Sequence, residues 1–200
     1  MIAIIDYGMG NLGSVQKALT FLGYESVITD SSSQAMVASG LILPGVGAMA
    51  HAMQALRDKG MDKLVFDYVD TGRPFLGICL GMQMLFDSSE EGDGRVKGLA
   101  LLPGRVLRFS TECGLKIPQI GWNSLVTVSD PALRKNDYVY FVHSYYCAPD
   151  RPEDVAATTQ YGIEYASAVA RDNILATQFH PEKSGEVGLA ILNRWARRTR

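Results

Sequence analysis

Apolar strands alternate with helical patterns along the first half of the chain, and this alternation restricts the fold more than any other feature. Strands are predicted at Ile2–Ile5, at residues 25–29 and 41–43, and in the run Pro74-Phe-Leu-Gly-Ile-Cys79. Helical spacing of apolar residues predicts helices between them, at about residues 13–22, 48–57 and 62–70. We therefore expect an α/β fold in which helices cover both faces of a mostly parallel sheet.

The second half of the chain has a different pattern, with short strands in close succession. They are predicted at residues 105–109, 125–127, 138–142, 155–159, 165–170 and 174–178. Turn pairs such as Tyr161-Gly162 and Asp172-Asn173 separate several of them, which indicates antiparallel hairpins added to the parallel core. A final helix is predicted at about residues 185–197. Because no linker or repeat interrupts the sequence, we expect one domain over residues 1–200.

Composition narrows the functional classes. With 200 residues, of which 47% are apolar and 20% charged, the chain can form a substantial core. Its net charge of −2 gives no electrostatic reason to expect a nucleic-acid partner. The three cysteines lack CxxC spacing, which argues against a disulfide framework or metal site and fits a reducing cytoplasm. No apolar run reaches the roughly 18 residues of a membrane span, and no signal peptide is expected. We predict a cytoplasmic protein without a membrane partner.

The run that ends at Cys79 contains a motif of nucleophilic enzymes. Glycines lie two residues to either side of the cysteine, at Gly77 and Gly81, between an apolar strand and a helical pattern that continues to Phe86. This is the thiol form of the G-x-S-x-G elbow, in which a sharp strand-to-helix turn exposes the nucleophile. Both glycine positions favour a residue without Cβ. The start of a helix favours a thiolate, and the N–H group of Leu80 would face a developing oxyanion. An inert core cysteine is the alternative, since one short motif does not establish a nucleophile.

A candidate base for this cysteine lies near the C-terminus. His180 follows an apolar strand, and Glu182 stands two residues later. In an extended segment residues i and i+2 face the same side, so the carboxylate could orient the imidazole to accept a thiol proton. Pro181 would stiffen the span between them. An ordinary histidine at a strand end is the alternative, but together with Cys79 these residues form a nucleophile, a base and an orienting group.

Residues 8–13 predict a different class of function. Gly8-Met-Gly-Asn-Leu-Gly13 is a complete G-x-G-x-x-G between a strand and a helix, and Asp30 ends the second strand. This pattern is typical of an oxidoreductase that binds a nicotinamide dinucleotide. Asp6 and Tyr7 weaken the interpretation, because they place polar and bulky groups before the first glycine. The length leaves little room for a separate substrate domain, and the motif at Cys79 would have no role.

Several segments together resemble known enzymes, the triad-type class I glutamine amidotransferases. The segments are Gly77-Ile-Cys-Leu-Gly-Met-Gln83, Pro44-Gly-Val-Gly47 and Phe179-His-Pro-Glu182. Further segments resemble, more narrowly, the glutaminase subunits of imidazole glycerol phosphate synthase. They are Asp6-Tyr-Gly-Met-Gly-Asn-Leu12, Gly121-Trp-Asn123, Tyr140-Phe-Val-His-Ser-Tyr-Tyr146 and Glu182-Lys-Ser-Gly185. The resemblance covers residues 6–185. It implies a flavodoxin-like fold with a central, mostly parallel sheet, flanking helices and added antiparallel hairpins.

The resemblance implies a chemical role for the triad. Cys79 would attack the carboxamide of glutamine to form a γ-glutamyl thioester and release ammonia. His180 would take the thiol proton, pass it to the leaving nitrogen and then activate water, while Glu182 would orient the imidazole. No cofactor and no metal are implied.

The resemblance also implies residues that bind the substrate. Backbone N–H groups of Leu80 and of the 44–47 loop, at Val46 or Gly47, would form the oxyanion hole. The residues expected to hold the amino-acid end of glutamine are Gly47, Gln83, Ser144 and Tyr145. A tight turn is the alternative for the loop, and a plain surface helix residue is the alternative for Gln83.

A protein partner is the last implication of the resemblance. The family acts as a heterodimer with a (β/α)8-barrel cyclase, which uses the ammonia to make imidazole glycerol phosphate and AICAR from PRFAR in histidine biosynthesis. Candidate interface residues are Met9, Gly10, Asn11, Trp122, Asn123, Tyr140 and Lys183. Two alternatives stay open: a glutaminase subunit of another ammonia-dependent synthase, and a non-enzymatic interaction module.

Overall fold

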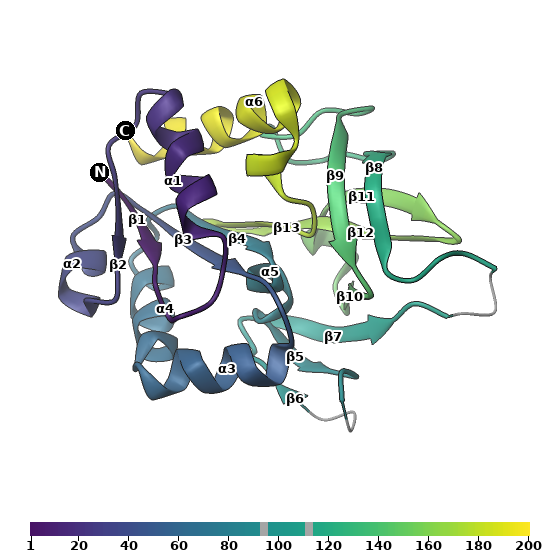
Figure 1. The fold of residues 1–200 in the computed structure, drawn as a ribbon, viewed down its shortest axis with the longest axis horizontal. Coiled ribbons are helices and arrows are strands. Elements are labelled where there is room, and N and C mark those ends of the chain that lie inside the picture. The colour runs from purple at the N-terminus through teal and green to yellow at the C-terminus, as the bar shows by residue number, and fades with distance from the viewer. Residues whose placement is uncertain (93–95, 111–113) are drawn as a thin grey trace.

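A long mixed β-sheet crosses the whole molecule (Figure 1). The computed structural model describes residues 1–92, 96–110 and 114–200 of the chain. The parallel half of the sheet consists, in spatial order, of β2 (Ser26–Thr29), β1 (Ile2–Ile5), β3 (Gly40–Gly45), β4 (Phe75–Cys79) and β13 (Ile174–Thr177). This order is that of flavodoxin-like sheets, in which ligands bind beyond the carboxyl ends of the strands. The predicted strands of the first half are therefore confirmed.

Beyond β13 the sheet continues with mostly antiparallel pairs. The strands are, in spatial order, β12 (Ile163–Arg171), β10 (Tyr145–Pro149), β7 (Leu102–Arg108), β5 (Phe86–Ser89) and β6 (Val96–Lys97), and β11 (Val155–Tyr161) pairs with β12. A separate antiparallel pair is formed by β8 (Gln119–Ser124) and β9 (Tyr138–His143). The turns predicted at Gly162 and Asp172 have positive φ and connect β11, β12 and β13, so the predicted hairpins are confirmed.

Helices cover both faces of the parallel half (Figure 1). They are α1 (Leu12–Phe21), α2 (Ser32–Met36), α3 (Met49–Asp58), α4 (Met61–Val69), α5 (Leu80–Gln83) and α6 (Gly185–Ala196), with 3₁₀ turns η2 (Pro152–Asp154), η3 (Pro181–Lys183) and η4 (Arg197–Thr199). In Figure 1, α1 and α6 lie above the sheet, and α3 and α4 lie below it. No helix in the described ranges combines the length and apolar character needed to cross a membrane.

Alternate residues of the central strands fill two cores. Ile2 and Ile4 of β1 belong to the core beneath α1 and α6, whereas Ala3 and Ile5 belong to the core against α3 and α4. Successive side chains of a strand point to opposite faces, so a strand buried on both faces is apolar throughout. The two cores hold the parallel strands rigidly, and the carboxyl ends of β1, β3, β4 and β13 meet at one edge of the sheet.

Two of the predicted elements differ from the structure. The helix after Cys79 was expected to reach Phe86, but α5 ends at Gln83 and Phe86 begins β5. The carbonyl groups of residues 84–86 accept hydrogen bonds from the segment 99–102, so the chain pairs with that segment and leaves the helix. The strand expected at residues 125–127 lies earlier in the chain, as β8. Gly121, with φ 136°, lies within β8 and obscured the strand pattern in the sequence.

Candidate active site

A strained turn places Cys79 at the junction of β4 and α5. Its backbone has φ 55° and ψ −108°, a conformation that a residue with a side chain rarely adopts. A Cβ at Gly81 would lie 1.9 Å from the Leu43 carbonyl oxygen, and one at Gly77 would lie 3.0 Å from the Gly81 oxygen. The close approach of β3, β4 and α5 thus requires both glycines and forces the sharp turn. The predicted elbow geometry is confirmed.

His180 and Glu182 are in direct contact. His180 Nδ1 and Glu182 Oε1 are 2.9 Å apart, and both side chains are almost completely buried. The sequence had suggested an extended segment between them. The segment is instead a turn, because Pro181 begins the 3₁₀ turn η3. The Lys183 N–H group closes this turn on the His180 carbonyl at 3.0 Å. The turn still brings the carboxylate to the imidazole.

Backbone hydrogen bonds fix His180 from two sides. Its N–H group donates to the Tyr140 carbonyl of β9 at 3.0 Å. The Ser184 hydroxyl donates to the His180 carbonyl at 2.6 Å and accepts from the Tyr140 N–H group at 2.9 Å. A base held by its neighbours in this way loses little freedom when the substrate binds.

The charge state of His180 follows from its neighbours. Burial by itself lowers the pKa of this imidazole, but the Cys79 and Glu182 side chains raise it, and the balance brings the pKa to about 10. At neutral pH His180 is therefore protonated. Its Nε2 atom makes no hydrogen bond in this conformation and is free to serve a reacting group.

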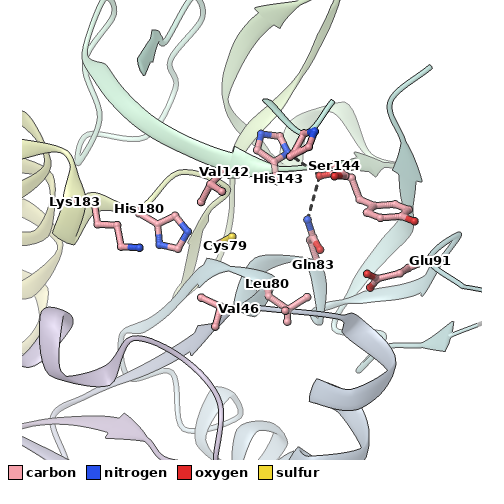
Figure 2. Close-up of a pocket in the computed structure, with 13 residues that line it drawn as sticks. Val46, Cys79, Leu80, Gln83, Glu91, Val142, His143, Ser144, His180 and Lys183 are labelled. Atoms are coloured by element: carbon pink, nitrogen blue, oxygen red, sulfur yellow. Dashed lines mark hydrogen bonds between the residues drawn. The ribbon is translucent and has the colours of Figure 1, made fainter. Parts of the chain in front are cut away.

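Cys79 and His180 line one pocket of about 440 Å³, a size typical of small-molecule sites (Figure 2). Its lining residues are Val46, Gly47, Cys79, Leu80, Gln83, Glu91, Pro118, Val142, His143, Ser144, Tyr145, His180 and Lys183. The predicted residues of the oxyanion hole and of the substrate site are thus all brought together in it. Figure 2 shows His180 and Lys183 at one end, Glu91 at the other, and Gln83 and Leu80 between them.

The 44–47 loop lies beside the cysteine. Gly45 pairs with Cys79 at the end of the β3–β4 ladder, and a Cβ on Gly45 would lie 2.8 Å from the Tyr7 hydroxyl. Tyr7 donates this hydroxyl to the Pro44 carbonyl at 2.9 Å, and burial raises its pKa, so it stays a neutral donor. Gly47 has φ 91° and lies at the pocket surface. Leu80 begins α5, and the first N–H groups of a helix have no acceptor within it.

The glycine-rich turn at residues 8–13 packs against this same loop. A Cβ at Gly10 would lie 3.5 Å from Pro44, and one at Gly47 would lie 3.2 Å from the Met9 side chain. The Asp6 carboxylate accepts the Gly8 N–H group at 2.9 Å. A carboxylate at this position repels a phosphate and occupies a donor that a phosphate would need, so the geometry disfavours dinucleotide binding.

Gln83 lies inside the pocket and not on the surface. Its side chain is only 6% exposed, and Nε2 donates to the Tyr145 carbonyl at 3.1 Å (Figure 2). His143 contacts the same carbonyl through Nδ1 at 2.7 Å. Burial lowers the pKa of His143 to about 4, so this ring is neutral and its Nδ1–H group donates.

Glu91 is a pocket residue that the sequence did not single out. Its Oε2 atom accepts the Met49 N–H group, at the start of α3, at 2.5 Å. The contact joins residues 42 positions apart, and no local motif signals it. The second carboxylate oxygen leaves Glu91 able to bind a cation at the pocket end opposite His180 (Figure 2).

The predicted interface residues lie around the same rim. Trp122 of β8 is 46% exposed, stacks on Tyr138 and contacts Tyr140 edge-on. Asn123 uses its amide within the chain, on the Gln160 carbonyl and the Ser124 N–H group. Met9, Gly10 and Asn11 lie in the turn beside the 44–47 loop, and exposed Lys183 lines the pocket.

The described residues contain no group of His, Cys, Asp and Glu side chains suited to a metal ion. Cys113 lies outside the described residues.

Comparison with known proteins gives a consistent result. Residues 3–197 match the family "Glutamine amidotransferase class-I". The imidazole glycerol phosphate synthase subunit HisH of Chlorobaculum tepidum is 50% identical, covering 98% of this chain and 99% of that protein. The HisH subunit of a Geobacillus species is 51% identical, covering 98% and 96%. A solved glutamine amidotransferase superposes with a TM-score of 0.78 at 18% identity, covering 100% of this chain and 99% of the other. Another, from Thermotoga maritima, has a TM-score of 0.72 at 16% identity, covering 99% and 96%.

Proposed function

We infer the function from the family, because this chain belongs to the class I glutamine amidotransferases and, within them, to the HisH subunits of imidazole glycerol phosphate synthase. It is the glutaminase subunit of that synthase and acts in histidine biosynthesis. We propose that residues 1–200 form one glutaminase domain in which Cys79, His180 and Glu182 carry the reaction. The observation that most supports this is the strained Cys79 turn in one pocket with His180, whose imidazole contacts the buried Glu182 carboxylate.

The reaction follows from these positions. Cys79 Sγ attacks the carboxamide carbon of glutamine, forming a C–S bond and a tetrahedral oxyanion that N–H groups of Leu80 and of Val46 or Gly47 stabilise. When the C–N bond breaks, His180 gives its proton to the nitrogen, which leaves as ammonia. Water, activated by the now neutral imidazole, hydrolyses the thioester, so glutamate leaves and the Cys79 thiolate is restored beside protonated His180. Glu182 holds Nδ1 of His180 throughout.

The pocket also supports one orientation of the substrate. The carboxamide must reach Cys79 and His180, so the amino-acid end points toward Gln83 and Glu91 (Figure 2). We assign the α-ammonium group to the Glu91 carboxylate, because an ammonium needs an acceptor and gains most from a charged one. Backbone groups of Gly47, Ser144 and Tyr145 then face the substrate carboxylate.

We further propose that the chain works as a heterodimer with a (β/α)8-barrel cyclase in the cytoplasm. The rim formed by Met9, Gly10, Asn11, Trp122, Asn123, Tyr140 and Lys183 would contact the cyclase. Half-exposed Trp122 stacked on Tyr138 is the type of aromatic anchor that dominates interface energies. Docking there would enclose the ammonia released beside Lys183 and pass it to the barrel, where it is used to make imidazole glycerol phosphate and AICAR from PRFAR.

One experiment tests the function. Glutamate release from glutamine is measured for the wild type and for Cys79→Ala, each with and without the cyclase and its ribonucleotide ligand. We expect release by the wild type that rises when the liganded cyclase is present, and none by Cys79→Ala. Equal release by Cys79→Ala would contradict the triad, and equal turnover with and without the cyclase would contradict the coupling.

A further inference from the structure

A buried glutamine with no role in the triad touches the reacting sulfur. Gln178 follows β13 directly and precedes His180 by two residues, and its side chain is completely buried. Its Nε2 atom donates toward Cys79 Sγ at 3.7 Å, within hydrogen-bond reach of a sulfur acceptor. Its Oε1 atom accepts a hydrogen bond from Gln83 Nε2 at 3.1 Å.

The orientation of the Gln178 amide follows from its neighbours. The Tyr145 carbonyl can only accept, so the Gln83 group that faces it at 3.1 Å must be the amide nitrogen. The remaining hydrogen on that nitrogen points at Gln178, which must therefore present its oxygen to Gln83 and its nitrogen to Cys79. Neutral His143 donates to the same Tyr145 carbonyl and holds it in place.

We propose that Gln178 is a catalytic residue that stabilises the Cys79 thiolate by hydrogen bonding, and that Gln83 sets its orientation. A hydrogen bond to a charged acceptor is stronger than one to a neutral acceptor, so this contact favours the thiolate over the thiol. It also fixes the direction of Sγ.

Other titratable groups also surround the sulfur. They are His180 after β13, Lys183 in η3, Tyr7 after β1 and Cys147 in β10, with His143 and Glu91 farther along the pocket. Protonated His180 also acts on the sulfur, because the Cys79 side chain raises the pKa of His180. Tyr7 and Cys147 are neutral, since burial raises the pKa of each. Gln178 adds an uncharged hydrogen-bond donor to the sulfur.

The inference rests on the proposed role of Cys79, but its test does not require glutamine turnover. The rate of Cys79 alkylation by iodoacetamide is followed from pH 5 to pH 10 by mass spectrometry of the peptide that contains Cys79. Gln178→Met keeps the side-chain length and removes the donor. We expect the pH of half-maximal rate to rise by about one unit and the rate at pH 7 to fall by up to roughly tenfold.

Further variants separate the proposed contact from a general effect on packing. Gln178→Glu, of the same shape, places a carboxyl group against the sulfur and also raises the midpoint, so either variant that folds decides the question. Gln83→Met does not touch Sγ but frees the Gln178 amide to rotate, and we expect a smaller rise. Thr159→Val, an isosteric change at a buried hydroxyl away from the pocket, leaves the midpoint unchanged.

The outcomes are distinct. An unchanged midpoint in folded Gln178→Met would overturn the inference, and so would an equal rise in Thr159→Val. A raised midpoint in a protein that releases no glutamate would support the contact while contradicting the proposed function. Glutamate release by the wild type with an unchanged midpoint in Gln178→Met would support the function and contradict the contact.

Discussion

Replacing Glu91 by glutamine removes the carboxylate charge at the end of the pocket opposite His180. The change preserves the hydrogen bond that positions this side chain, because the glutamine carbonyl can accept the Met49 N–H group in place of Oε2. What is lost is one charge-assisted contact with the substrate ammonium, worth about 1.5–3 kcal/mol. We therefore expect kcat/KM for glutamine to fall roughly 10- to 150-fold, mostly through KM.

The assay compares two substrates. Glutamine is set against 4-carbamoylbutanoate, which has the same carboxamide and carboxylate but a hydrogen atom in place of the ammonium group. The wild type should use this analogue poorly, and Glu91→Gln should use it as well as the wild type does, because the contact is already missing. Glu90→Gln is the matched control, since Glu90 bonds the Arg108 N–H group and does not line the pocket.

An equal loss on both substrates would refute the reasoning. It would mean that Glu91 acts by holding the start of α3 and not by binding the ammonium. No loss on glutamine would refute it as well, because the proposed orientation of the substrate leaves the ammonium at Glu91.

Three other predictions follow from the same geometry. Glu182→Gln keeps an acceptor for His180 Nδ1 but removes the charge that raises the pKa of His180. We expect kcat to fall roughly 10²- to 10⁴-fold and the alkaline limb of the pH profile of kcat to move to lower pH. An unchanged pH profile would contradict this prediction. Burial lowers the pKa of His143 from 6.5 to about 4, so between these pH values the unfolded chain binds a proton that the folded protein does not. The free energy of unfolding should therefore be highest above about pH 6.5 and fall on the order of 3 kcal/mol as the pH drops toward 4. Urea unfolding of His143→Gln should show a flatter dependence of this free energy on pH. Trp122→Ala should leave the free energy of unfolding nearly unchanged but weaken cyclase binding by calorimetry at least roughly 30-fold, whereas Phe21→Ala, at a more exposed residue of α1, should bind normally.

The parts of the site that the sequence predicted are those that local geometry dictates. Cys79 needs glycines two residues away because β3 and α5 approach its backbone within contact distance, and this requirement appears directly in the spacing. His180 and Glu182 are only two residues apart in the chain, so the predicted contact forms even though η3 is a turn and not an extended segment. The apolar strands of the parallel half were predictable because burial on both faces leaves no polar position.

The parts that the sequence missed depend on contacts between distant residues. Glu91 reaches the pocket through a hydrogen bond 42 positions away, and Gln178 reaches Cys79 across 99 positions. Neither residue belongs to a periodic pattern of its own. Similarly, α5 ends at Gln83 because the Leu99 N–H group, 15 residues after Met84, donates a hydrogen bond to the Met84 carbonyl. Met84, Leu85 and Phe86 are all completely buried, so their apolar character fits a helix and a strand equally well.

The glycine-rich turn at residues 8–13 shows how one pattern can serve two purposes. In a dinucleotide site such glycines bring backbone N–H groups to a phosphate. Here Gly8 and Gly10 also need positive φ, but they bring the turn against Pro44, while Tyr7 binds the Pro44 carbonyl. The residue that separates the two cases is Asp6, which directs its carboxylate at the Gly8 N–H group and so excludes an anion. The glycines determine the shape of the turn, and the polar residues beside them determine what the turn can bind.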